Sequence, residues 1–95
     1  MPPVRRMVAD VLKPHQPSLP DFARQMAAVE SIEAATATLL ERDEEVQNVK
    51  VTVEGEAVSP ERLENAIEDI GGSLHSVDEV SCGEYVVEER RTPQD

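Results

Sequence analysis

The chain has 95 residues, of which 20 are acidic and 9 basic, so its formal net charge at pH 7 is −11. Clustered Lys and Arg, which neutralise phosphates, are scarce, so neither nucleic acid nor an anionic membrane surface is an expected partner. No apolar run approaches the ~20 residues of a spanning helix, and no signal-peptide pattern is present, so we expect a cytoplasmic protein. The single cysteine, Cys82, excludes an intrachain disulfide.

The acidic excess predicts adaptation to a very salty cytosol, as in a halophile. A surface with this charge repels itself at low ionic strength, and molar salt screens the repulsion to a Debye length of roughly 3 Å. The alternative, a disordered acidic segment, predicts low hydrophobicity and no periodicity. The periodic elements described next argue against disorder, and the length favours one domain over residues 1–95.

The first half of the chain predicts a strand, a helix and a second strand. Alternating apolar residues indicate a strand at 4–13, which the following prolines end. Ser18 is the expected N-cap of a helix whose apolar residues recur at helical spacing. This stripe consists of Leu19, Phe22, Met26 and Val29. The second strand is expected at 34–43.

The second half repeats this order. The clearest alternation in the chain predicts a strand at 46–54, directly after a charged turn. Ser59, followed by a proline, is typical of a helix N-cap, and Gly71 and Gly72 are expected to end that helix. A fourth strand is expected at 73–81.

The order β-α-β-β-α-β predicts an α+β, ferredoxin-like fold with a four-stranded antiparallel sheet and two helices on one face. Right-handed crossovers are expected to place the strands at 4–13 and 46–54 in the centre, parallel to each other, in an otherwise antiparallel sheet. Residues 85–87 are expected to add a short edge strand, and residues from about 88 to 95 a polar tail.

The face of the sheet without helices is expected to be bare and to present Val8 and Leu12. An exposed apolar sheet face marks an interface more often than not. We therefore predict a homo-oligomer that forms through this bare face or through the strand edges, with no nucleic acid or membrane partner.

The two histidines suggest a candidate site. His15 follows the first strand and His75 lies near the start of the neighbouring fourth strand, so the fold could bring them together. Carboxylates in the same neighbourhood are Asp10, Asp78 and Glu79. Imidazole with carboxylate suits a divalent metal or an acid–base pair, and carboxylates alone suit Ca²⁺ or Mg²⁺. The structural alternative is a set of solvated residues in which Arg6 neutralises Asp10.

Two other features favour structural interpretations. Cys82 has no second ligand at a metal-binding spacing, so a buried or half-buried structural thiol is expected rather than a nucleophile. An acidic run predicts a solvated hairpin turn, with loose cation binding as the alternative. The run consists of Glu41, Asp43, Glu44 and Glu45.

Four segments together resemble the archaeal family catalogued as domain of unknown function 211. They span residues 8–18, 48–55, 71–80 and 92–95. The most specific parts read Asp-Val-Leu-Lys-Pro-His from residue 10 and His-Ser-Val-Asp-Glu-Val from residue 75. The resemblance covers nearly the full length.

This resemblance implies a ferredoxin-like fold, an archaeal cytosolic source and multi-subunit homo-oligomers, rings among them. It implies no known activity. The lysines and large core residues associated with the family appear in this chain as Glu, Ala and Arg, which agrees with salt adaptation.

Two classes of function follow. The favoured hypothesis is a non-enzymatic, homo-oligomeric binding or regulatory module with a divalent cation at the Asp/His cluster. The alternative is a small enzyme in which His15 or His75 acts as a general base in a site shared between subunits.

Overall fold

A computed structural model describes residues 1–87 of the chain. Its elements follow the predicted order: β1 (Val4–Pro14), α1 (Leu19–Ala27), β2 (Ala34–Arg42), β3 (Val46–Glu54), α2 (Pro60–Asp69) and β4 (Ser73–Cys82). The predicted short strand at 85–87 is wrong, because no strand follows β4 within residues 1–87. The expected polar tail at 88–95 lies outside the described residues.

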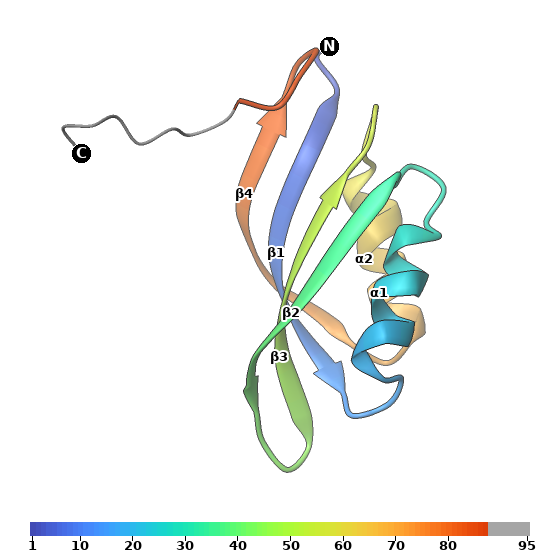
Figure 1. Cartoon of the computed structure of the whole chain (residues 1–95), viewed down its shortest axis with the longest axis vertical. Helices are drawn as coiled ribbons and strands as arrows, with labels where there is room; N and C mark the ends of the chain where they lie inside the picture. Colours follow the sequence, from blue (N-terminus) through green and yellow to red (C-terminus); the bar gives the residue numbers. More distant parts are fainter. Residues whose placement is uncertain (88–95) are drawn as a thin grey trace, which may run out of the picture.

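The four strands form one antiparallel sheet in the order β2-β3-β1-β4, with both helices on one side (Figure 1). β1 and β3 are central, as predicted, but the expectation that they run parallel is wrong. Met7 lies opposite Val53 and Val11 opposite Val49 in an antiparallel ladder. The reason is that each crossover joins two parallel strands with a third strand between them, β1 to β2 across β3 and β3 to β4 across β1.

The apolar core lies between the helices and one face of the two central strands. In the middle of each strand, every second residue points to the helices and is at most 1% exposed. These residues are Met7, Ala9 and Val11 in β1 and Val49, Val51 and Val53 in β3. The helices add the fully buried side chains of Phe22, Met26, Leu63 and Ile67. Burial of one such side chain stabilises the fold by about 1.5–3 kcal/mol.

Both helices begin at the predicted serine caps. The Ser18 hydroxyl accepts the Asp21 N–H at 3.3 Å, and the Ser59 hydroxyl accepts the Arg62 N–H at 3.2 Å. Each bond satisfies one of the N–H groups that a helix leaves unpaired at its start.

The end of α2 needs the two glycines that follow it. Gly71 has a φ of 85° and donates to the Glu68 carbonyl at 2.9 Å, while Gly72 donates to the Ile67 carbonyl at 3.0 Å. This pair of bonds is a Schellman motif. A Cβ on Gly72 would lie 2.8 Å from the Leu12 carbonyl oxygen, so its lack of a side chain lets α2 end close against β1.

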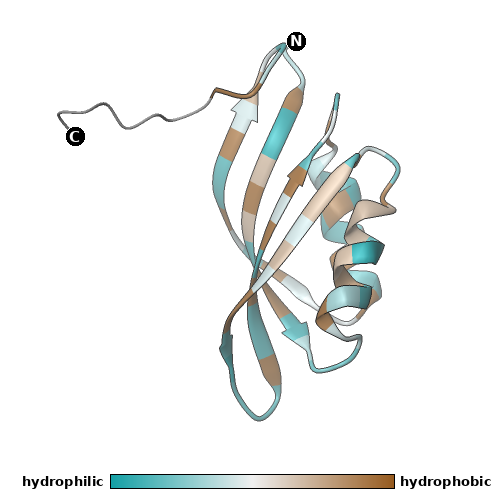
Figure 2. Ribbon diagram, in the orientation of Figure 1, coloured by the Kyte–Doolittle hydropathy of each residue, from teal (hydrophilic) through white to brown (hydrophobic). Residues whose placement is uncertain are grey.

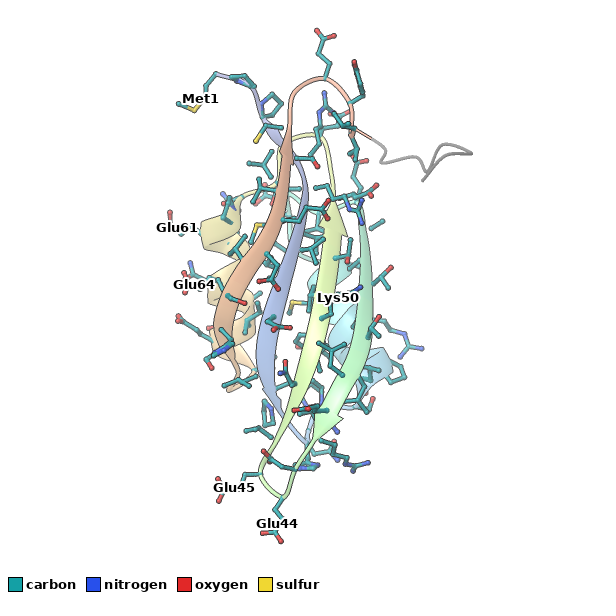
Figure 3. All side chains as sticks on the ribbon, turned by 90° about the vertical axis from the view of Figure 1, so that its left-hand side faces the viewer. Met1, Glu44, Glu45, Lys50, Glu61 and Glu64 are labelled. Atoms are coloured by element: carbon teal, nitrogen blue, oxygen red, sulfur yellow. The ribbon has the colours of Figure 1, made fainter. Side chains whose placement is uncertain are left out.

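The opposite face of the sheet is open and largely polar. Figure 3 looks onto this face, with the helices behind the strands and Lys50 on the near side. By alternation, β1 presents on it Arg6, Val8, Asp10 and Leu12. The neighbouring residues of β3 are Asn48, Lys50, Thr52 and Glu54. Only Val8, which is 8% exposed, and the half-buried Leu12 are apolar among these eight, so the face is less apolar than expected.

Candidate functional site

Asp10 and Glu79 both belong to the open face. Asp10 lies opposite Lys50 of β3 and Ser76 of β4, and Glu79 lies opposite Val8. Both carboxylates therefore reach the surface on the side away from the helices.

Arg6 does not serve as the partner of Asp10. Its side chain lies between two carboxylates of the neighbouring strands, with Nε 3.7 Å from Glu54 and a terminal nitrogen 3.9 Å from Glu79. Within residues 1–87, Asp10 makes no ion pair within 4.0 Å. Asp10 is half-buried as a residue and lies on the open face.

The structure does not bring the two histidines together. The His15 ring turns to the β2–β3 hairpin, where its Nε2 lies 2.9 Å from the Asp43 carbonyl oxygen. His75 lies beside the central part of β1, because Ser73 pairs with Leu12 and the two strands are antiparallel. His15, in contrast, follows the C-terminal end of β1. The offset along β1 is about four residues, or roughly 13 Å at 3.3 Å per residue.

His75 and Asp78 occupy irregular positions in β4. The pairing of β4 with β1 shifts register at each of them, since Val77 and Glu79 pair with consecutive residues of β1, as do Leu74 and Ser76. Both side chains are exposed, and the Asp78 carboxylate accepts the Ser76 hydroxyl at 2.9 Å. Bulges of this kind redirect side chains away from the regular alternation.

Within residues 1–87 of a single chain, no group of three or more His, Cys, Asp or Glu side chains is placed to hold a metal ion. The five predicted site residues are instead distributed over the open face, the edge strand β4 and the loop after β1. Cys82 is exposed rather than buried or half-buried, at the end of β4.

A buried lysine is the polar feature that sequence reasoning missed. The Lys13 side chain is fully buried, and its Nζ donates to the Pro14 carbonyl at 2.8 Å, to Gln47 Oε1 at 3.0 Å and to the His15 carbonyl at 3.5 Å. Burial lowers the pKa of Lys13, and the nearby Arg42 guanidinium lowers it further. The signal was present in the sequence, because Lys13 continues the alternation of Met7, Ala9 and Val11.

The hairpin between β2 and β3 is a solvated acidic turn, as predicted, with Glu44 and Glu45 at its tip (Figure 3). The Asp43 carboxylate accepts the backbone N–H groups of Val46 at 2.8 Å and Glu45 at 2.9 Å. These two bonds, that of Val46 first, lower the pKa of Asp43, and the neighbouring His15 adds to the effect. Asp43 thus has a structural role in closing the turn.

A shallow depression of about 370 Å³ lies where this hairpin meets the open face. It is lined by Leu12, Glu41, Arg42, Asp43, Val46 and Asn48. The Asn48 Oδ1 atom is buried and has no hydrogen-bond donor. The lining combines two carboxylates, a guanidinium and two apolar side chains, so the depression is polar enough for a small charged ligand but offers no enclosed cavity.

Neither α1 nor α2, the helices of the described residues, is long and apolar enough to cross a membrane.

Comparison with known proteins matches the chain to an uncharacterised group. Residues 5–95 match the family DUF211, described as "Uncharacterized ArCR". The chain is 44% identical over 92 residues to "Uncharacterized protein MJ0319" of Methanocaldococcus jannaschii, covering 97% of this chain and 95% of that protein. The chain therefore belongs to the DUF211 family.

Proposed function

We propose that the protein is a non-enzymatic binding or regulatory module that works as a homo-oligomer. The observation that carries this proposal is that both helices cover the same side of the sheet, so the other face and the outer edges of β2 and β4 have no cover within residues 1–87 (Figure 1). A sheet edge presents unpaired N–H and C=O groups that favour pairing with another chain.

The edges support association better than the open face does. The large apolar side chains that are exposed within the strands are Leu39 and Leu40 in β2 and Val77 and Val80 in β4, each between 42% and 49% exposed. On the open face of the central strands, by contrast, Val8 is only 8% exposed in the single chain, so it has little surface left to bury in a contact. Contact between copies would therefore remove more apolar surface from water at the edges.

A divalent cation, Ca²⁺ or Mg²⁺, is proposed as the ligand of the oligomer. Asp78 and His75 lie on an edge strand, and Asp10 and Glu79 lie on the adjoining open face. Since these residues form no complete ligand set within residues 1–87 of one chain, the coordination would be completed by another copy that contacts the β4 side of the sheet. Oxygen ligands of this type are those that hard cations prefer.

Isothermal titration of metal-stripped protein in molar KCl tests cation binding. Saturable heat with Ca²⁺ or Mg²⁺ is expected, and it should weaken at least tenfold in Asp10→Asn or Asp78→Asn. Glu41→Gln is the matched control at the hairpin depression, which should leave the affinity unchanged. Flat heats, or a loss of binding only in Glu41→Gln, would remove the proposed ligand set.

Salt adaptation in the cytosol is the second part of the proposal. The net charge of −11 on 95 residues supports it, because repulsion of that size favours expansion unless salt screens it. The midpoint of thermal unfolding is expected to rise between 0.1 M and 2 M KCl. A midpoint that stays constant or falls over this range would contradict the proposal.

A further inference from the structure

The two edge strands of the sheet differ in charge. Within the described residues, β2 pairs only with β3 and β4 only with β1, so each has one unpaired edge. Charged residues make up 31% of the chain, yet residues 34–40 of β2, which read Ala-Ala-Thr-Ala-Thr-Leu-Leu, contain none. β4 has Asp78 and Glu79 at adjacent positions near its middle.

The two edges also differ in regularity. β2 pairs with β3 without interruption from Ala34 to Leu39 and shifts register only between Leu39 and Glu41. β4 shifts register against β1 at three places. Bulges and charges are the features by which proteins prevent edge strands from pairing with other chains. β4 has both, whereas the first six residues of β2 have neither.

Residues 34–38 of β2 have small side chains, and most of the strand is accessible. Thr36 and Thr38 are exposed, and Leu39 and Leu40 are 42% and 49% exposed. Figure 2 shows β2 in pale and brown tones along most of its length, turning hydrophilic only at its end. Small Ala and Thr side chains let another strand approach closely, and Thr–Thr pairs are favourable across strands.

We propose that β2 of a second copy pairs antiparallel with this edge, so that the sheets of two copies form one continuous sheet. This inference rests on the proposed homo-oligomer and identifies one of its contacts. β4, which carries the proposed cation ligands His75, Asp78 and Glu79, lies at the opposite edge of the sheet and is left for contact with a further copy. Pairing of a strand with itself is two-fold symmetric, so the contact is complete with two copies.

The sequence of β2 is self-compatible, which favours a second copy as the occupant. Copies with a net charge of −11 can approach closely only where carboxylates do not face each other. In an antiparallel pairing centred on Thr36, only Ala and Thr face one another over residues 34–38, and Glu33 lies opposite Leu39. No carboxylate of the paired strands then faces another carboxylate. Two like charges directly opposite each other would destabilise the pairing.

Sedimentation equilibrium of the full chain in 1 M KCl tests this pairing. Wild-type protein is expected to dimerise, and Thr36→Lys is expected to weaken the association at least tenfold, because the two introduced lysines would then face each other directly across the two-fold axis. Ser73→Lys on β4 is the matched control. It changes the net charge by the same amount on the other edge strand and should leave the association unchanged.

Circular dichroism melting confirms that each variant folds, and Thr36→Arg replaces Thr36→Lys if the latter does not. A monomeric wild type at 1 M KCl would overturn both the edge pairing and the proposed oligomer. A wild-type dimer that Thr36→Lys leaves intact would overturn the edge pairing alone. Loss of association in Ser73→Lys but not in Thr36→Lys would assign the contact to β4 instead.

Discussion

The two lysines of the chain lie on opposite faces of the same sheet and show what each face requires. Lys50 is exposed on the open face, where water solvates its ammonium group (Figure 3). Lys13 is fully buried on the helix-covered face, where three protein oxygens take the place of water. The covered face therefore accepts a polar group only with its hydrogen bonds supplied, whereas the open face places no such condition on its residues.

The largest difference between the faces is expected from neighbouring residues of β3. Val51→Ala removes two methyl groups from the core and leaves a cavity, so the free energy of unfolding should fall by about 2 kcal/mol. Thr52→Ala, one residue further on the open face, should change it by less than about 0.5 kcal/mol. Urea denaturation measures both values. Equal losses at the two positions would show that the open face is covered in solution.

A smaller but still clear difference is expected between the lysines. Lys13→Met should lower the free energy of unfolding by about 1–1.5 kcal/mol, because the Pro14 carbonyl and Gln47 Oε1 each lose a donor in a buried site. Lys50→Met is the control and should have almost no effect. Adding Gln47→Leu to Lys13→Met should recover part of the loss, since it removes one of the unsatisfied acceptors. A double variant less stable than Lys13→Met would contradict this account.

The ammonium of Lys13 also gives a pH dependence with a definite sign. Its pKa in the folded protein is lowered from 10.5. At pH values between the folded pKa and 10.5, the unfolded chain therefore binds more protons than the folded one. The free energy of unfolding should then rise with pH between the folded pKa and 10.5. The measurement is the wild-type value minus the Lys13→Met value at several alkaline pH values. A difference that stays flat or falls would show that burial does not perturb Lys13.

The fold could be predicted from local patterns, whereas most of the candidate site could not. Alternation in β3 identified the core face, and Ser18 and Ser59 identified the helix starts, because these signals depend on neighbouring residues alone. The position of His15 depends on the path of the chain after Pro14, and that of His75 on a bulge whose cause is its pairing with β1. Neither position produces a periodic pattern in the sequence.

The smallest effect is expected at the hairpin, beyond the helix-covered region. Asp43→Ala removes the carboxylate that accepts the Val46 and Glu45 N–H groups, so the melting temperature should fall by less than in Lys13→Met. Since these bonds lower the Asp43 pKa below its ordinary 3.8, the stabilisation is fully present above that value and is lost as the pH falls through the folded pKa. The melting temperatures of wild type and Asp43→Ala should therefore converge in acid. Asp43→Asn retains an acceptor oxygen and should lie between them at neutral pH, which separates the hydrogen bonds from the charge. If Asp43→Asn instead matched Asp43→Ala, the negative charge rather than the geometry of the turn would account for the effect.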